Sequence, residues 1–294
     1  MAQTRNAAAL TLACEITPSR VIAARGNHSR TEVESASARS LSAGSIVPGL
    51  TGENVAKPDE LRTAVEEVLS IVGSHSKDVI IVVPDSVVRV VLLEFETLPE
   101  KQAEADGVIR FRLKKSLPFD VEKALLSYDV RRTNTGVKVI AAVAQPSVVQ
   151  QYEAVFRTAG YEPGVVLPSS LAALGAVDAD RPTLVLKVDA QTTTLTIVDQ
   201  DQLLLFRTLE GGAKAVTGER IAEDVYPSLV FLQDNYGLSV ERVLLAGVPS
   251  IAEIAPVLEQ QTGAKVSDLV DSSIAPGTGV PRGELAGVVG ALLS

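Results

Sequence analysis

The sequence contains no tryptophan, one methionine, one cysteine and two histidines in 294 residues. A single cysteine excludes an intrachain disulfide and a cysteine-rich zinc site. That residue, Cys14, lies in an apolar run, which is typical of a small core side chain. A hydrolytic triad needs a base, and both histidines, His28 and His75, lie in polar, loop-like stretches. We therefore predict no catalytic residue.

Recognisable metal and nucleotide motifs are also missing. The sequence has no HExxH, no Asp-x-Asp-x-Asp-Gly loop and no GxxxxGK[ST], and the glycines at 277, 279 and 283 do not have GxGxxG spacing. The net charge of −9 excludes general binding to nucleic acid, because a phosphate backbone needs a basic surface. No apolar run reaches the roughly 18 residues of a membrane span, so we expect a cytoplasmic protein. Because the metal-binding motifs are missing, we expect no residues that bind a metal ion.

Aliphatic residues are abundant instead. Hydrophobic residues make up 46% of the chain, aromatic residues only 4%, and the mean hydropathy is +0.22. This composition is typical of sheets covered by helices, and the length favours two lobes. We predict a first lobe over 1–180 and a second over 181–294. Three successive short strands open each lobe, at 9–16, 21–24 and 32–41, and again at 184–188, 193–198 and 203–209.

The rest of each lobe alternates strands with helices. The first lobe continues with a helix from Pro58, a buried strand at 79–83, a helix at 146–159 and a strand at 165–167, and about 85–145 forms a β-α-β-β insertion. The second lobe continues with a helix at 217–235, a strand at 243–245 and helices at 251–261 and 285–293. This order predicts an α/β protein whose two related lobes enclose a cleft.

A basic cluster at the end of the predicted helix 100–115 stands out from the acidic background. Arg110, Arg112, Lys114 and Lys115 lie in the segment IRFRLKKSLPF, beside Phe111, Pro118 and Phe119. One interpretation is favourable placement of cations at a helix C-terminus. The other is a docking surface for an acidic partner or an anionic membrane.

Several segments resemble the PilM family of type IV pilus assembly proteins, which belongs to the actin-like superfamily together with FtsA. The resemblance spans nearly the whole chain. It is most specific at VIIVVPDSVVRVVLLEFETLPEKQAEADGVIRFRLKKSLPFDVEKALLSYDV (79–130), and it includes FRTLEGG (206–212) and VLLAGVPS (243–250). It implies an actin-like, ribonuclease H-like duplicated fold with two lobes and an insertion subdomain.

The sequence departs from the nucleotide motifs of that superfamily. Actin-like ATPases hold phosphate with two hairpin turns of the form Asp-x-Gly, where glycine lets backbone N–H groups approach the oxyanions. Here the first turn reads Glu15-Ile16-Thr17-Pro18, in which proline removes a donor, and the second turn, which begins at Asp189, has no glycine. The adenosine turn keeps one glycine, Gly247, of the usual two.

Chain length gives a second argument. Only about thirty residues separate Gly212 from the strand at 243–245, enough for one long helix at roughly 1.5 Å per residue, so the second-lobe roof subdomain is expected to be reduced or absent. We predict that the protein does not hydrolyse ATP, because phosphoryl transfer relies on positioned charges and donors.

The resemblance implies a scaffold that lies peripherally on the cytoplasmic face of the inner membrane. Its partners would be the N-terminal tail of a PilN-like membrane protein and other pilus assembly components, with homo-oligomers also compatible. The tail would bind between the first lobe and the insertion subdomain. The residues that we predict for this contact are Arg89, Leu98, Pro99, Phe111, Arg112, Lys114, Pro118 and Phe119.

Two alternatives remain open at this stage. In the first, the chain is an ATP-binding switch that still holds ATP and Mg²⁺, and the residues that would bind the nucleotide are Asp189, Thr192, Thr193, Gly211, Gly212 and Gly247. In the second, it is a GspL-like component of a type II secretion system, although that family is membrane-anchored.

Overall fold

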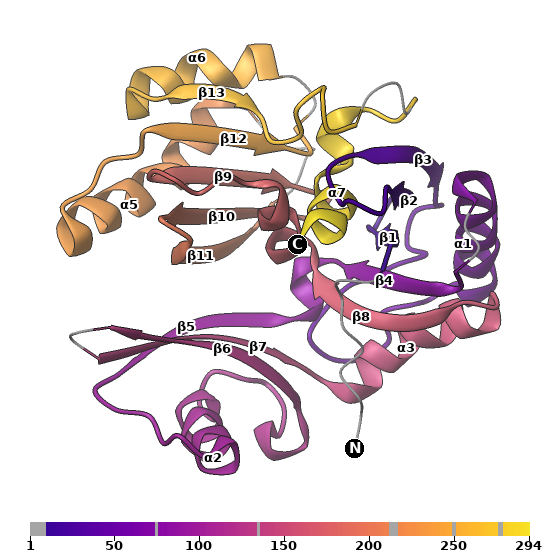
Figure 1. Ribbon diagram of the computed structural model, residues 1–294, viewed down its shortest axis with the longest axis horizontal. Coiled ribbons are helices and arrows are strands. Elements are labelled where there is room, and N and C mark those ends of the chain that lie inside the picture. Colours follow the sequence, from indigo (N-terminus) through magenta and orange to yellow (C-terminus); the bar gives the residue numbers. More distant parts are fainter. Residues whose placement is uncertain (1–9, 74–75, 134–135, 212–216, 249–250, 276–278) are drawn as a thin grey trace.

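The computed structural model describes residues 10–73, 76–133, 136–211, 217–248, 251–275 and 279–294 (Figure 1). Two five-stranded sheets and one three-stranded sheet form the framework. Figure 1 shows the two larger sheets as separate lobes, with the smaller sheet below the second lobe. None of the helices in these ranges combines the length and the hydrophobicity of a membrane span.

The first sheet has the order β3-β2-β1-β4-β8. Strands β1 (Leu12–Ile16), β2 (Arg20–Gly26) and β3 (Val33–Ser40) form an antiparallel meander, and β4 (Asp78–Val83) and β8 (Glu162–Pro168) extend it in parallel with β1. Alternate residues of β1 face opposite sides. Leu12, Cys14 and Ile16 pack with α1 (Pro58–Val72) and α3 (Pro146–Thr158), whereas Ala13 faces α7 (Ala286–Leu293).

The second sheet repeats this topology in the order β11-β10-β9-β12-β13. Its strands are β9 (Thr183–Val188), β10 (Thr192–Asp199), β11 (Gln202–Glu210), β12 (Arg242–Ala246) and β13 (Lys265–Asp268). Helices α5 (Gly218–Tyr236) and α6 (Ile251–Thr262) cover one face. The matching strand order confirms the predicted relation between the lobes. Within the described residues α5 is the one helix between β11 and β12, as expected for a reduced roof.

The insertion subdomain is a sheet of order β5-β7-β6 covered by one helix. It comprises β5 (Arg89–Phe95), α2 (Gln102–Leu113), β6 (Leu125–Thr133) and β7 (Gly136–Ala144). This confirms the predicted β-α-β-β order. A 3-10 turn at Asp85–Val87 precedes the subdomain's first strand, which begins at Arg89.

Helix α7 packs between the two large sheets. Its side chains share one core with β1, β2 and β4 of the first sheet and with Val185 and Leu244 of the second. It also lies against α4 (Ser169–Ala173) so closely that a Cβ on Gly290 would collide with the carbonyl oxygen of Ala172. The predicted boundary between residues 180 and 181 falls in the loop before β9, but α7 returns to the first sheet, so contacts alone do not divide the chain there.

Replacing Gly290 with alanine should therefore destabilise the protein. The added methyl group must push apart two backbones that cannot adjust separately, and overpacking of this kind costs about 1–3 kcal/mol. The control is Gly107→Ala in α2, where a Cβ meets no atom within 4 Å. That variant should gain about 0.5–1 kcal/mol, because glycine is unfavourable inside a helix. Urea denaturation measures both; equal stabilities would contradict the tight contact.

Candidate functional site

The first hairpin turn, between β1 and β2, satisfies its polar groups internally. The Thr17 hydroxyl accepts the backbone N–H of Arg20 at 3.0 Å and donates to the Arg20 carbonyl at 3.0 Å, while the Thr17 N–H donates to the same carbonyl at 2.9 Å. Pro18 has no N–H to offer. The turn to which the resemblance assigns phosphate binding is thus closed by its own threonine.

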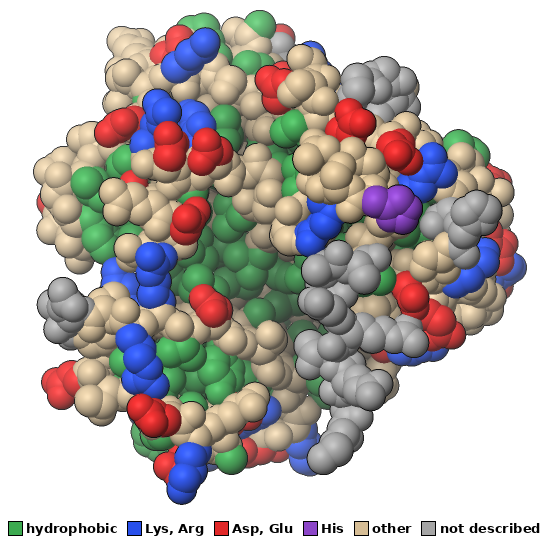
Figure 2. Space-filling view, in the orientation of Figure 1, with side chains coloured by type: hydrophobic (Ala, Val, Ile, Leu, Met, Phe, Trp, Pro, Cys, Tyr) green, Lys and Arg blue, Asp and Glu red, His purple; other side chains and the backbone are tan. Residues whose placement is uncertain are grey.

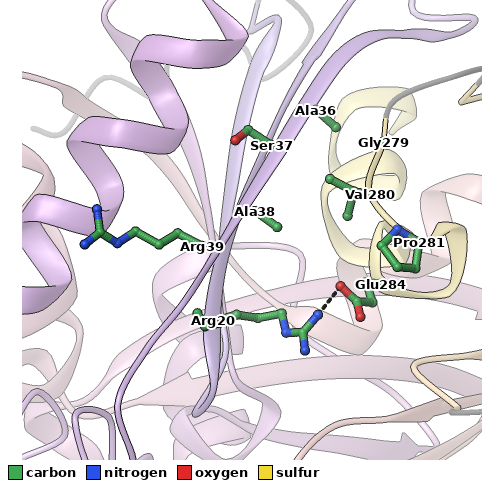
Figure 3. A pocket seen from close by; sticks show the side chains of 10 residues that line it. Arg20, Ala36, Ser37, Ala38, Arg39, Gly279, Val280, Pro281 and Glu284 are labelled. Carbon is green, nitrogen blue, oxygen red and sulfur yellow. Dashed lines mark ion pairs between the residues drawn. The ribbon is translucent and has the colours of Figure 1, made fainter.

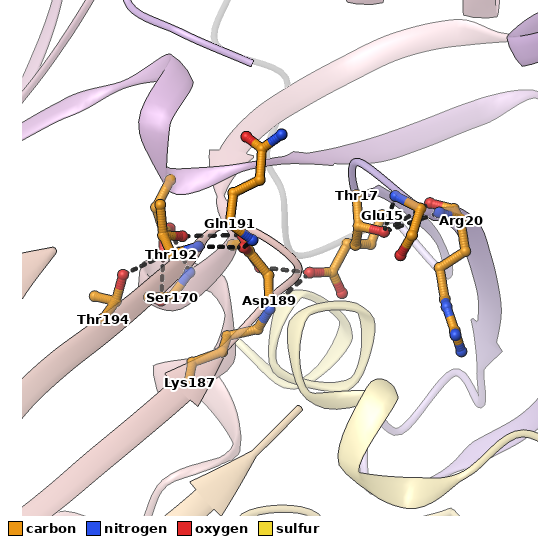
Figure 4. A network of polar contacts seen from close by, with 12 residues as sticks. Glu15, Thr17, Arg20, Ser170, Lys187, Asp189, Gln191, Thr192 and Thr194 are labelled. Carbon is orange, nitrogen blue, oxygen red and sulfur yellow. Dashed lines mark hydrogen bonds and ion pairs between the residues drawn. The ribbon is translucent and has the colours of Figure 1, made fainter. Parts of the chain in front are cut away.

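The second hairpin turn, between β9 and β10, is closed by its aspartate. The Asp189 carboxylate accepts the N–H groups of Gln191 at 2.6 Å and Thr192 at 2.7 Å, and the Thr192 hydroxyl at 3.0 Å (Figure 4). The Thr193 hydroxyl donates to the Gly211 carbonyl at 3.0 Å. The structure brings these four predicted nucleotide-binding residues together, but their donors already have partners within the protein.

The last two residues of that prediction differ from the others. Gly212 lies outside the described residues. At Gly247 the backbone has φ +72°, and its N–H donates to the Gly283 carbonyl at 2.8 Å. A Cβ there would collide with the Val188 carbonyl. Glycine is needed at 247 for the close approach of the β12 end to β9, independently of any ligand.

The cleft between the lobes contains a buried ion pair. The Lys187 ammonium near the end of β9 donates to Glu15 Oε1 near the end of β1 at 2.9 Å, and the two side chains are 10% and 1% exposed (Figure 4). Burial opposes the charged form of Lys187, but the carboxylates of Glu15, Asp85 and Asp189 outweigh it and raise the lysine pKa above its ordinary value. Lys187 was not among the residues predicted from the sequence.

Little free space remains in the cleft. A cavity of about 140 Å³ lies between the two hairpin turns, Gly247 and the loop that precedes α7. Small-molecule sites usually measure about 300–1,000 Å³. An ion pair between Arg20 and Glu284 joins this loop to β2, beside a surface hollow of about 400 Å³ against β3 (Figure 3). In the described part of the chain no three acidic, cysteine or histidine side chains gather as a metal site would require.

The structure describes two of the three histidine and cysteine residues, and neither is suited to act as a catalytic base or nucleophile. His28 is exposed, and His75 lies outside the described ranges. Cys14 is fully buried, and burial, followed by the neighbouring charge of Glu15, raises the pKa of its thiol. A buried thiol of this kind is a poor nucleophile.

A larger groove of about 670 Å³ lies between the insertion subdomain and the second lobe. Its walls are β5 and β11, each an edge strand of its own sheet, so both have backbone groups free to pair with another chain. Pro48, Gly49 and Leu50 of the first lobe and Phe231 of α5 complete the lining. Figure 2 shows hydrophobic side chains gathered in this hollow.

Two arginines line the groove, one on each wall. Arg89 on β5 and Arg207 on β11 are both exposed, and among the described residues neither makes an ion pair or a side-chain hydrogen bond. The far end of the insertion is held to the second lobe by other groups: Arg131 donates to the Asp201 carbonyl at 3.1 Å, and the Lys138 ammonium lies 4.7 Å from the Tyr236 ring centroid.

The predicted partner-binding residues fall into separate places. Only Arg89 lines the groove. Leu98 is 5% exposed in the core of the insertion, and Phe119 packs partly against that core. Phe111, at 79% exposure, lies on α2 with exposed Arg112, and exposed Lys114 and Pro118 follow the helix. Pro99 lines a different hollow, between α2 and β6. In Figure 1, α2 lies on the side of the insertion sheet that faces away from β11.

Part of the basic cluster has a structural role. The Arg110 guanidinium donates to the carbonyls of Val121 and, at 3.2 Å, Ala124. It therefore secures the end of α2 to the chain that enters β6. Arg207 was not among the predicted contacts, because its sequence segment does not reveal that β11 is an edge strand opposite β5.

Two substitutions in the insertion distinguish core from surface. Leu98→Ala should cost about 2–4 kcal/mol, because it opens a cavity in a small core. Phe111→Ser should change stability by less than about 0.5 kcal/mol, because its ring is exposed. Thermal and chemical denaturation measure both effects. A destabilised Phe111→Ser protein would show that the ring packs against something in solution.

Comparison with known proteins identifies the fold. No family model matches the chain, and no curated protein matches its sequence. A chain of the PilM–PilN type IV pilus biogenesis complex superposes with a TM-score of 0.81 at 19% identity, over 96% of this chain and 97% of that one.

Two further solved structures have lower TM-scores. The cytoplasmic domain of EpsL, an inner-membrane component of the Vibrio cholerae type II secretion system, has a TM-score of 0.52 at 12% identity, over 90% of this chain and 98% of that one. A Bacteroides thetaiotaomicron protein with an actin-like ATPase fold has a TM-score of 0.51 at 12% identity, over 100% and 99%. The chain has an actin-like fold, and the predicted fold class is confirmed.

Proposed function

We propose that this protein is a non-catalytic scaffold of a type IV pilus assembly complex, peripheral on the cytoplasmic face of the inner membrane. Its partner is the N-terminal tail of a PilN-like membrane protein. The proposal draws on the likeness to the PilM–PilN complex over 96% of the chain. The observation that carries it is the groove between β5 and β11, which offers two unpaired strand edges to an extended segment.

The groove's chemistry defines the segment that it suits. An extended peptide can add to one strand edge through its backbone, while alternate side chains reach the apolar lining around Leu204 and Phe231. Arg89 and Arg207 favour a peptide that carries at least one carboxylate, since an arginine and a carboxylate form strong charge-assisted hydrogen bonds. Binding a peptide requires no catalytic residues, so this role is compatible with a scaffold.

We further propose that the scaffold neither binds nor hydrolyses ATP. Both hairpin turns use their own side chains to satisfy the N–H groups that a phosphate would need. Lys187 and Glu15 fill the adjoining part of the cleft, and the remaining cavity is smaller than an ordinary nucleotide site. These features support a pseudo-ATPase over the nucleotide-binding switch.

A role in type II secretion is a second candidate. The fold likeness to the cytoplasmic domain of EpsL, at a TM-score of 0.52, favours it. Purification of the protein from cell membranes, followed by identification of the bound proteins, distinguishes the two candidate functions. A pilus scaffold should retain pilus inner-membrane components, whereas a secretion scaffold should retain secretion components.

The groove is tested with synthetic peptides that cover the tail of the PilN-like protein from the same organism. The double variant Arg89→Ala/Arg207→Ala should bind at least about tenfold more weakly, because a hydrogen bond to a charged group contributes about 1.5–3 kcal/mol. Fluorescence anisotropy of a labelled peptide gives the affinity.

The matched control is Arg112→Ala/Phe119→Ala, which changes two of the residues predicted for the contact that lie outside the groove, on α2 and in the segment that follows it. If this control weakens binding and the groove variant does not, the partner binds at α2 and the groove assignment is wrong.

Nucleotide binding is tested by calorimetry. We expect no heat of binding when Mg²⁺-ATP is added to millimolar concentration, because the N–H donors of both turns are already hydrogen-bonded. Measurable heat at micromolar Mg²⁺-ATP would contradict the proposal of a pseudo-ATPase and would favour the ATP-binding switch.

A further inference from the structure

Two carboxylates of the first lobe reach across to the second lobe. Glu15 of β1 accepts the Lys187 ammonium of β9 at 2.9 Å. Asp85, at the root of the insertion, accepts the Thr194 hydroxyl of β10 at 2.7 Å. Each carboxylate is buried, with residue exposures of 1% for Glu15 and 7% for Asp85. We call these four residues the interlobe clamp.

The two halves of the interlobe clamp meet at α4. Ser169 donates its hydroxyl to Glu15, and Ser170 donates both its hydroxyl and, at 2.8 Å, its backbone N–H to Asp85. The serines are 3% and 2% exposed. Consecutive residues of one short helix therefore set the positions of both carboxylates, so the two contacts are not independent.

The Glu15–Lys187 pair follows from the duplication of the fold. Glu15 is the next residue after Ala13 on the side of β1 that faces α7, and Lys187 follows Val185 in the same way on β9. Since β1 and β9 are the equivalent central strands of the two sheets, opposite charges occupy matching positions in the two repeats. The two sheets face each other across α7, which brings the charges together.

Burial makes the spacing of this pair strict. A buried ion pair adds little net stability, but removing or displacing one partner leaves an uncompensated buried charge, which is strongly unfavourable. On the opposite side the backbone of Gly287 in α7 packs against the Glu15 carboxylate so closely that a Cβ would collide with it. The carboxylate cannot move away to follow another arrangement of the lobes. A displacement of one lobe would lengthen the Glu15–Lys187 contact and leave both charges less well compensated.

We propose that the interlobe clamp fixes the two lobes in one closed arrangement without any bound ligand, with the Lys187 ammonium serving as a built-in cation in the cleft. The lobes then form a rigid body that does not open and close with nucleotide. This inference concerns the cleft alone and does not depend on which partner binds the groove.

Distances between spin labels on the two lobes test this inference. The single native cysteine, Cys14, is fully buried and should not react, so labels can be placed at Ile71→Cys on α1 and Tyr226→Cys on α5, where the native side chains are 67% and 60% exposed. In the full chain we expect one narrow distance distribution that Mg²⁺-ATP does not shift. Lys187→Met, which removes the cation, should broaden the distribution or move it to longer distances.

Two further variants make the test selective. Lys265→Met removes an exposed lysine from β13 of the same sheet and should leave the distribution unchanged. Glu15→Gln keeps an oxygen that can accept from Ser169 but removes the negative charge, so it should reproduce the Lys187→Met effect and keeps the test available if that variant does not fold. Circular dichroism establishes folding.

Three results would overturn the inference. These are a native distribution that is already broad, a native distribution that shifts on addition of Mg²⁺-ATP, and folded Lys187→Met or Glu15→Gln proteins whose distributions match that of Lys265→Met.

Discussion

A charge removed from water must find a partner, and this requirement at Glu15 governs much of the structure. The carboxylate sits at 1% exposure between the two sheets. A lysine from the opposite sheet, a serine from α4 and a glycine in α7 are all needed to accommodate it. The relative placement of two sheets, one short helix and one longer helix is therefore tied to a single side chain.

The cleft and the groove differ in how many of their polar groups have hydrogen-bond partners within the protein. In the cleft, threonine and aspartate side chains satisfy the hairpin turns, and Lys187 and Ser169 both donate to Oε1 of Glu15, while the buried Oε2 of that carboxylate has no hydrogen-bond partner among the described residues. In the groove, two strand edges and two guanidinium groups are left without protein partners among the described residues. The groove therefore exposes hydrogen-bonding groups that remain available to another molecule.

The sequence predicted the framework well because local patterns determine it. The apolar run at 79–83 and the helix that begins at Pro58 carry strong local signals, and the structure has β4 and α1 at those places. Two short elements were missed. Strand β13 (Lys265–Asp268) has a single buried apolar residue, and α4 (Ser169–Ala173) is too short to show a helical period.

The candidate site was harder to predict because it depends on which elements become neighbours. Asp189, Thr192 and Thr193 lie close together in the sequence, but the sequence does not reveal that Thr192 donates to the Asp189 carboxylate and Thr193 to the Gly211 carbonyl. Leu98 was grouped with surface residues, whereas it lies in the core of the insertion. The one available signal for Lys187 was a lysine inside an otherwise apolar strand, at a position matching Glu15 in the other repeat.

The two uncovered strand edges also bear on how the protein avoids aggregation with other copies of itself. An exposed edge strand can pair with the edge strand of another copy, and such pairing is a first step toward aggregation. Here β5 and β11 turn their edges toward each other inside one crevice instead of outward. Both edges therefore lie along one groove that the insertion subdomain and the second lobe enclose together, and another copy's sheet would have to enter this groove to pair with either edge.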